Sequence, residues 1–490
     1  MNGAVFLIAM AVSGLLAMLV PAVLVAFGHS ELELATDMLL LFAVGTFVVV
    51  AVVAALTGRV KETERAFTYL ALVGVWIATP IVAAVVFMVL ADLPFVPAWF
   101  EAVGALTTSG ASVLVREEAP QGVLFWRTMC EWYGGFLTLA SIIHVLAPAG
   151  FGGLQSNSPV STTIPEEGLF KVTTYYRLVG QYTFITCLIF LGLLAFGVQP
   201  LEAAMLGMIS AATGGFLPFS GPLDENISQG AATVMAVGFC LGTISVFWRR
   251  QIFRRPRRLI QTSLEAKIVA IVIIGLTIAY AVRIVDVSGG SVGSTIVAAI
   301  QEGFFTASSL VATSGIETRP GVMALLPNIV VLAVVFVGAG VYSTTGGVKV
   351  FRIGTMWIYT IAELNRLIYP SSVDRLKFGN LAIERQSMQA IWTYFIIAVL
   401  VVGGGAMLIA LTATGFEAAI VMSVAFFSNA SPIYEALRPI ASDATSGDWP
   451  SFMTLSNPIT YVLAIAVMTI GRLEVLVIFA VLNIRYWYNR

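Results

Sequence analysis

The sequence predicts an all-α polytopic membrane protein, and three observations lead to that class. Of its 490 residues, 58% are hydrophobic and only 11% are charged, whereas a soluble protein usually carries about 25% charged residues. Apolar runs of about 20 residues, long enough to cross a hydrocarbon core of about 30 Å, recur along the chain. These apolar runs do not alternate apolar and polar residues as membrane-barrel strands do. Four related stretches lie between the apolar runs.

Ten spanning helices are predicted from the apolar runs. They cover 4–28, 38–57, 67–91, 121–147, 175–198, 229–250, 264–286, 327–352, 387–412 and 456–482. The first run has no basic segment before it and no small-residue cleavage site, so we expect a retained helix and not a signal peptide. The three cysteines and two histidines lack the spacing of a metal cluster.

The four stretches between the later helices share one pattern. They are FEAVGALTTSGAS at 100–112, LEAAMLGMISAATGGF at 201–216, QEGFFTASSLVATSGIE at 301–317 and FEAAIVMSVAFFSNASP at 416–432. Their opening acids are Glu101, Glu202, Glu302 and Glu417, and their closing glycines are Gly110, Gly214 and Gly315, with Ser431 in the fourth. Each apolar part is about 10 to 14 residues long, too short to span a bilayer, which predicts a re-entrant segment.

Four re-entrant segments predict a cation pore around one axis. Backbone that is not helical at membrane depth is tolerated only where protein buries it or where it lines a wet cavity. A short helix that ends at such a loop points its negative end inward, and the free carbonyls can replace the water shell of a cation. Small hydroxyl residues are also common packing contacts, but packing explains one such break better than four at matching positions.

The predicted filter lies at 107–111, 212–216, 312–316 and 428–432. Its residues are Thr107, Thr108, Ser109, Gly110, Ala111, Ala212, Thr213, Gly214, Gly215, Thr313, Ser314, Gly315, Ile316, Asn429, Ala430, Ser431 and Pro432. Their backbone and hydroxyl oxygens are expected to hold the transported ion. No catalytic nucleophile, acid pair or metal cluster stands out, so no enzyme activity is predicted.

A glycine-rich stretch, GAGVYSTTGG at 338–347, lies inside the eighth apolar run. It lacks the lysine spacing of a P-loop and the strand context of a dinucleotide fingerprint. Because glycines weaken a helix, a break in the helix is predicted. Arg472 lies in the middle of the last predicted helix, where a charge usually faces a cavity or a partner. It is therefore either a charge beside the pore or half of a buried structural ion pair.

These features together resemble the Trk/Ktr/HKT superfamily of potassium and sodium transporters, most closely its bacterial TrkH-type subunits. Besides the four stretches, the matching signatures are GAGVYSTTGGVKVFRI at 338–353, GRLEVL at 471–476 and, more weakly, WRTMCEWYGG at 126–135. The resemblance covers nearly the whole chain. It implies two N-terminal helices at 1–65, followed by four membrane–pore loop–membrane repeats around a pseudo-fourfold pore. The implied repeats lie at 66–150, 151–260, 261–372 and 373–490.

The resemblance also implies a function and partners. The expected activity is potassium uptake, with K+ as the transported ion and no bound cofactor. Gating would fall to the loop below the filter and to Arg472. The implied gating residues are Gly338, Gly340, Ser343, Thr344, Thr345, Gly346, Gly347, Lys349 and Arg472. A homodimer, membrane lipid and a separate cytoplasmic TrkA-like nucleotide-binding regulatory subunit are the implied partners, and nucleic acid is not expected.

The fourth loop departs from the family pattern, because Ser431 stands where a glycine is expected. In plant HKT members a serine at a filter glycine of the first repeat goes with sodium transport. A sodium or mixed sodium/potassium transporter therefore remains an alternative. An ion-coupled secondary transporter of a small solute is a remoter one, since that class also contains broken helices.

Charge placement predicts the orientation. Basic loops, including RRQIFRRPRR at 249–258, fall on the same side as both termini, which the positive-inside rule makes cytoplasmic. The basic residues used are Arg59, Lys61, Arg65, Arg366, Arg375, Lys377, Arg385, Arg485 and Arg490. The acids expected outside are Glu31, Glu33, Asp37, Glu117, Glu118, Asp224, Glu225, Asp443 and Asp448. The pore loops would then enter from outside a plasma membrane, which the family resemblance makes a bacterial inner membrane.

Overall fold

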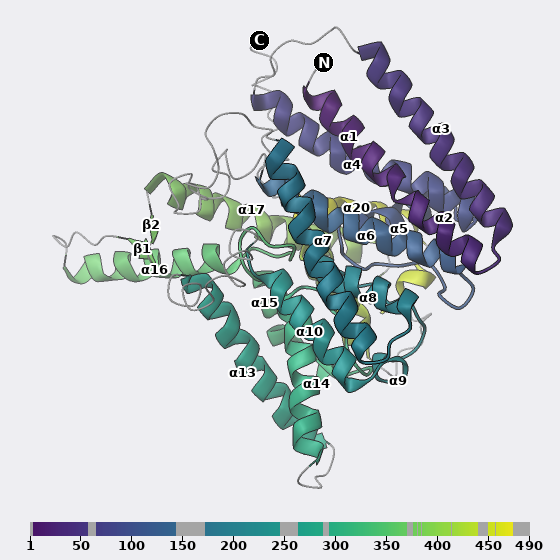
Figure 1. Ribbon diagram of the computed structural model, residues 1–490. Helices are drawn as coiled ribbons and strands as arrows, with labels where there is room; N and C mark the ends of the chain where they lie inside the picture. The colour runs from purple at the N-terminus through teal and green to yellow at the C-terminus, as the bar shows by residue number, and fades with distance from the viewer. Residues whose placement is uncertain are drawn as a thin grey trace.

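The protein is built almost wholly of helices, and the predicted all-α polytopic class is confirmed (Figure 1). The computed structural model describes residues 3–56, 65–143, 172–245, 263–287, 294–369, 376–379, 381–383, 385–412, 414–439, 449–455 and 457–473. Within these ranges the only strands are a two-residue antiparallel pair, β1 (Lys377–Phe378) and β2 (Leu381–Ala382).

The N-terminal helices differ from their predicted bounds. The helix predicted at 4–28 is divided at Met18 into α1 (Gly3–Ala17) and α2 (Leu19–Gly28). The next helix, α3 (Leu32–Leu56), begins six residues earlier than predicted, so Glu33 and Asp37 are helical and not in a loop. An acid in the first turn is favoured by the helix dipole, which explains the earlier start. α1 packs on α4 and α2 packs on α6, while α3 stands at the edge of the molecule (Figure 1).

The rest of the chain repeats one order of helices: a first helix, a short helix, a loop and a second helix. The first helices are α4 (Arg65–Leu90), α7 (Val172–Ala195), α13 (Leu264–Val287) and α17 (Arg385–Ala410). The short helices are α5 (Phe95–Leu106), α8 (Pro200–Ala212), α14 (Ser294–Val311) and α18 (Phe416–Phe427). The second helices are α6 (Gln121–Ser141), α10 (Gln229–Thr243), α15 (Asn328–Val337) and α20 (Pro458–Arg472).

Helix contacts close these units into a ring. Each first helix packs on the short helix of its own unit: α4 on α5, α7 on α8, α13 on α14 and α17 on α18. Each second helix packs on the short helix of the following unit: α6 on α8, α10 on α14, α15 on α18 and α20 back on α5. Because the last contact returns to the first unit, the four short helices are brought together at the centre.

Burial divides the helices into an outer and an inner set. Six described helical segments are long and apolar enough to span a membrane; five of them come from α3 and the four first helices, and the sixth is Ala11–Gly28. The outer helix α3 exposes Leu40 and Phe47, as a lipid-facing helix should. By contrast most of α6 is buried, including Arg127 and Glu131. The second helices are shorter or more polar because they face protein.

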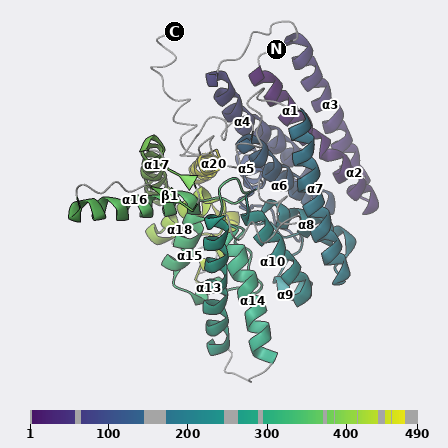
Figure 2. The same cartoon turned by 60° about the vertical axis from the view of Figure 1, so that its left-hand side comes forward.

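Two predicted bounds are corrected by the structure. α14 has 18 residues and is longer than the predicted re-entrant helix. The helix predicted at 327–352 is broken where the glycine-rich stretch predicted a break: α15 ends at Val337. A further helix, α16 (Val350–Ile368), begins after the break and runs well past the predicted end. Both views show α16 reaching away from the ring (Figures 1 and 2).

Four short helical elements lie in the connections between the longer helices. They are α9 (Leu223–Asn226), α19 (Pro432–Leu437), η4 (Met323–Leu325) and η5 (Phe452–Thr454). Several sequence predictions lie outside the described residues. They are the helix ends 144–147, 246–250 and 474–482, the arginine-rich run 249–258, and Arg59, Lys61, Arg375, Asp443, Asp448, Arg485 and Arg490.

Candidate functional site

The four loops that follow the short helices share one unusual backbone conformation. One residue in each has a positive φ: 57° at Thr108, 54° at Thr213, 57° at Thr313 and 51° at Asn429. The next amide in each loop donates to the carbonyl five residues back, as Ser109 does to Gly104 at 2.9 Å and Ala430 to Ala425 at 2.8 Å. Positive φ is uncommon and strained in residues other than glycine. Four copies of it at matching positions show that the loops are structurally equivalent.

This equivalence corrects the alignment made from the sequence. The residues two positions after the positive-φ residues are Gly110, Gly215, Gly315 and Ser431. The second loop therefore matches the others through Gly215 and not through Gly214. The opening acids are also not equivalent, since Glu101 lies seven residues before its positive-φ residue and Glu302 lies eleven before its own.

Ser431 does not adopt the strained conformation expected of a filter glycine. Its φ is −59° and its ψ is −32°, an ordinary right-handed helical conformation, and it begins α19. Gly110 and Gly315 each have a φ of 75°, where a glycine is favoured. The serine is therefore accommodated because the fourth loop turns into a helix at this residue.

The four loops meet one another at the centre of the ring. Ser431 donates its backbone N–H to the carbonyl of Ser109 at 2.8 Å, and their hydroxyl oxygens are 2.5 Å apart. The Ser314 hydroxyl donates to the carbonyl of Gly214. A Cβ at Gly110 would lie 2.6 Å from the Cα of Gly215, and one at Gly315 would lie 2.8 Å from the Ile433 side chain. Segments more than 300 residues apart in the sequence thus share one small volume.

Backbone carbonyl and side-chain oxygen atoms of the four loops surround this volume. The short helices end at the loops, so their negative ends face it. Among the described residues, the hydroxyl of Ser428 and the amide oxygen of Asn429 are buried without a hydrogen-bond partner. The Thr107 hydroxyl donates its proton to the carbonyl of Val103 at 2.7 Å, which leaves its oxygen lone pairs as acceptors. Neutral oxygens in a ring suit a monovalent cation that has shed its water.

The 338–349 loop, between α15 and α16, closes one end of this volume. Its residues are buried apart from the half-buried Tyr342. Gly346 donates its N–H to the Thr313 hydroxyl at 2.8 Å, and the hydroxyls of Thr213 and Thr344 are 3.2 Å apart. A Cβ at Gly346 would overlap the carbonyl of Ser428. The 338–349 loop therefore contacts the second, third and fourth of the four loops at their positive-φ ends.

Two buried cations hold the 338–349 loop in place. Arg472 donates to the carbonyl of Thr344 at 2.7 Å. Lys349 donates to the carbonyls of Thr345 and Gly346 and to the Thr345 hydroxyl, and that hydroxyl also pairs with Ser343 at 2.7 Å. Lys349 has a φ of 84° and is buried, so it does not extend to the membrane surface as a lysine near a helix end often does.

Three charged residues near the loops were not singled out as site residues from the sequence. Glu265, in the first turn of α13, accepts the N–H of Val341 at 2.7 Å and so holds the start of the 338–349 loop. Glu131 and Arg127, on α6, contact the second loop. Both α6 residues lie in WRTMCEWYGG, and two charges inside a predicted spanning helix are the signal that could have found them.

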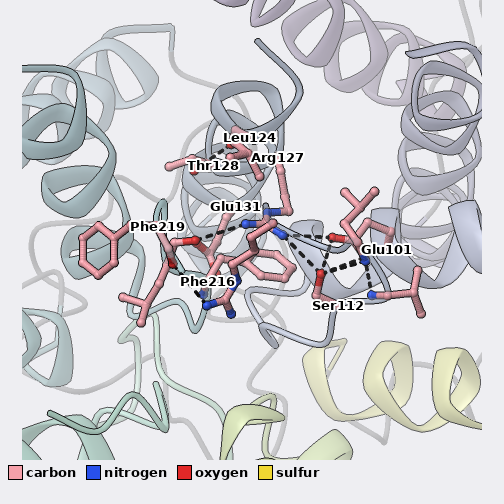
Figure 3. Close-up of polar contacts among 12 residues, drawn as sticks. Glu101, Ser112, Leu124, Arg127, Thr128, Glu131, Phe216 and Phe219 are labelled. Carbon is pink, nitrogen blue, oxygen red and sulfur yellow. Dashed lines mark hydrogen bonds and ion pairs between the residues drawn. The ribbon is translucent and has the colours of Figure 1, made fainter. Parts of the chain in front are cut away.

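Figure 3 shows the buried charges behind the first two loops. Glu101 accepts the Val113 N–H at 2.8 Å and the Ser112 hydroxyl at 3.0 Å. Arg127 lies 3.5 Å from Glu101 and donates to Ser112 at 3.1 Å. The first opening acid is thus a structural partner of its own loop. Glu417, the fourth, is exposed.

An ion pair lies beside the third loop. Arg319 donates to Glu302, which also accepts the Thr318 hydroxyl at 2.9 Å. The hydrogen bonds that Arg319 donates to Glu302 raise the pKa of the Arg319 guanidinium above its usual value. Asp224, from the second unit, lies 4.0 Å from the same guanidinium. Through Asp224, Arg319 therefore joins the second and third units next to the loops.

Comparison with known proteins gives one consistent result. The chain is 26% identical over 419 residues to the Trk system potassium uptake protein TrkH of Escherichia coli strain K12, covering 81% of this chain and 80% of that protein. It is 26% identical over 406 residues to TrkH of Halomonas elongata, covering 79% and 78%. The crystal structure of the potassium transporter TrkH from Vibrio parahaemolyticus matches with a TM-score of 0.84 at 20% identity, over 99% of this chain and 100% of that one. No protein-family model matches.

The fold and the four converging loops define a class, the polytopic all-α membrane protein with four re-entrant units around one axis. Within that class, the resemblance to the TrkH-type membrane subunits of Trk systems, predicted from the sequence motifs, is confirmed by likeness over four fifths of the chain and by the shared fold.

Proposed function

We propose that this chain is a channel-like transporter that takes up potassium, and is not an enzyme. The relatives it resembles are named potassium uptake proteins. The observation that carries the proposal is the convergence of four loops with the same positive-φ residue on one volume of neutral oxygens. Carbonyl and hydroxyl oxygens at 107–111, 212–216, 312–316 and 428–432 would replace the water shell of the ion.

The 338–349 loop and Arg472 would control passage below the filter. The loop bonds to the filter threonines Thr213 and Thr313, so it lies where an ion leaving the filter must pass. Arg472 reaches the same loop and puts a positive charge beside it, which opposes the entry of a cation. Movement of the loop and of this charge would open the path.

A sodium or mixed sodium/potassium transporter is the second candidate, and the contact between Ser109 and Ser431 favours it. The two hydroxyls add oxygen ligands and a direct contact between the first and fourth loops. A smaller and more adaptable ring would favour the smaller ion. Potassium remains the leading candidate because Ser431 is unstrained and the other three loops keep their glycine.

The test is cation flux into liposomes that contain the purified protein, compared for potassium, rubidium, sodium and lithium, with protein-free liposomes as the control. Flux of potassium and rubidium well above sodium in the wild type supports the leading proposal. Comparable sodium flux, with potassium preference gained in Ser431→Gly, supports the second candidate. Uptake of an organic solute driven by an ion gradient contradicts both and favours a secondary transporter.

The remaining proposals concern surroundings and partners. Cytoplasmic termini and pore loops entering from outside follow from the charge placement in the sequence. A location in the bacterial inner membrane follows from the family resemblance. A homodimer and a separate nucleotide-binding regulatory subunit follow from the family resemblance. The exposed Trp357, Leu364 and Leu367 of α16 give an apolar face that supports contact with a second copy or with lipid.

A further inference from the structure

We propose that Glu131 is a positioning residue that sets the ion specificity of the second loop. It would do so by holding the two peptide groups around Gly215 with their carbonyls turned away from α6. This inference rests on the proposed function, since it assigns a role within the filter.

The contacts of Glu131 are with the backbone. One carboxylate oxygen accepts the N–H of Gly215 at 2.8 Å and lies 3.4 Å from the N–H of Phe216. Two successive amides thus face one oxygen atom, in the manner of a backbone nest. In a planar trans peptide the N–H and the C=O point in opposite directions, so the carbonyls of Gly214 and Gly215 turn away from Glu131. The Gly214 carbonyl accepts the Ser314 hydroxyl of the third loop, as this geometry requires.

The equivalent amide is bonded differently in the other three loops. Gly110 donates to the carbonyl of Gly104 at 3.2 Å, and Gly315 donates to that of Ser309 at 3.5 Å, both within their own short helices. Ser431 donates to the carbonyl of Ser109. In the second loop Thr213 and Gly214 donate back to their short helix, at Ser210 and Ile209, whereas Gly215 donates to Glu131. The Gly215 amide therefore depends on Glu131 for its hydrogen bond.

Close packing ties Glu131 to this loop. The carboxylate lies so near Gly214 that a Cβ there would overlap it, which accounts for two glycines in succession. Arg127, one turn earlier on α6, donates to the carbonyl of Leu217 at 3.2 Å and lies 4.4 Å from the centre of the Phe216 ring. Residues 215–217 are thus held by α6 and not by their own unit, as Figure 3 shows for Glu131 and Arg127.

The second oxygen of Glu131 distinguishes this residue from a simple structural partner. It is buried and has no hydrogen-bond partner among the described residues, and the residue is fully buried. A buried polar atom without a partner is costly, so the site keeps the carboxylate at the expense of stability.

Two variants separate geometry from charge. Glu131→Gln keeps the length of the side chain and an oxygen that can accept from Gly215, but removes the charge. Glu131→Asp keeps the charge, but its shorter side chain withdraws from the Gly215 amide. The potassium-to-sodium flux ratio is measured in liposomes for both variants and the wild type, together with the thermal unfolding midpoint. Glu417→Gln, at an exposed acid on α18, is the matched control.

We expect Glu131→Asp to lower the flux ratio at least about fivefold, because the hydrogen bond to the buried Gly215 amide is lost, while Glu131→Gln stays within about twofold of the wild type. The positioning role is overturned if Glu131→Gln lowers the flux ratio while Glu131→Asp keeps the wild-type value. It is also overturned if both variants keep the wild-type value. A fall in unfolding midpoint with an unchanged ratio also overturns it. A wild type that carries no cation contradicts the proposed function itself, which is a separate result.

Discussion

The hydroxyl oxygens of Ser109 and Ser431 are 2.5 Å apart, although 322 residues separate them in the sequence. The same two residues share a backbone hydrogen bond, from the Ser431 N–H to the Ser109 carbonyl at 2.8 Å. The first and last units of the chain are therefore joined at the loops themselves. This pair closes the ring at its centre, as α20 and α5 close it outside.

The contact between the Ser109 and Ser431 hydroxyls can be tested by measuring the unfolding free energy of serine-to-alanine variants. Ser109→Ala and Ser431→Ala each leave one buried hydroxyl unpaired, at a cost of about 1 to 3 kcal/mol of unfolding free energy. The double variant removes both hydroxyls, so we expect it to lose no more than either single variant. The unfolding midpoints of the four proteins in detergent measure this. Losses that simply add would show that the two hydroxyls do not interact.

Gly346→Ala is expected to raise cation flux. The added methyl group would overlap the Ser428 carbonyl, so the 338–349 loop must move away from the fourth loop. Gly403→Ala is the control, because a Cβ there meets no atom within 4 Å. Cation flux into liposomes and the open fraction of single channels are the measurements. Equal flux in Gly346→Ala, Gly403→Ala and the wild type would remove the loop from the gating mechanism.

Arg472→Ala is expected to raise cation leak by about tenfold or more. The variant loses the 2.7 Å bond to the Thr344 carbonyl and the positive charge beside the path, and a hydrogen bond from a charged group contributes about 1.5 to 3 kcal/mol. Arg472→Lys keeps the charge with fewer donors, so its cation leak should lie between that of the wild type and that of Arg472→Ala. If both variants instead yield less folded protein and show no added cation leak, the charge of Arg472 has a structural role.

Glu265→Ala is expected to loosen the start of the 338–349 loop. The Val341 N–H loses its partner at 2.7 Å, so we expect a raised open fraction and a loss of about 1 to 3 kcal/mol in unfolding free energy. Glu265→Gln retains an acceptor and should restore most of both properties. Flux and unfolding midpoints measured on the same preparations test this. An unchanged open fraction in Glu265→Ala would limit Glu265 to a packing role.

Much of the site could be predicted from residue types along the chain. Gly110, Gly315, the stretch at 338–347 and Arg472 were all found in this way, because small residues or a charge inside an apolar run are locally unusual. The register of the second loop was not, since two adjacent glycines, Gly214 and Gly215, fit the pattern equally well. Only the positive φ of Thr213 separates them.

The sequence by itself determined the membrane class, the order of the helices and the position of the break near Gly338, because hydropathy and helix propensity are local properties. The tertiary structure decided which residues meet: Ser109 with Ser431, Thr213 with Thr344, and Glu131 with Gly215. These contacts join different units, so no spacing along the chain specifies them. They form because each second helix packs on the short helix of the next unit, which brings four distant loops into one volume.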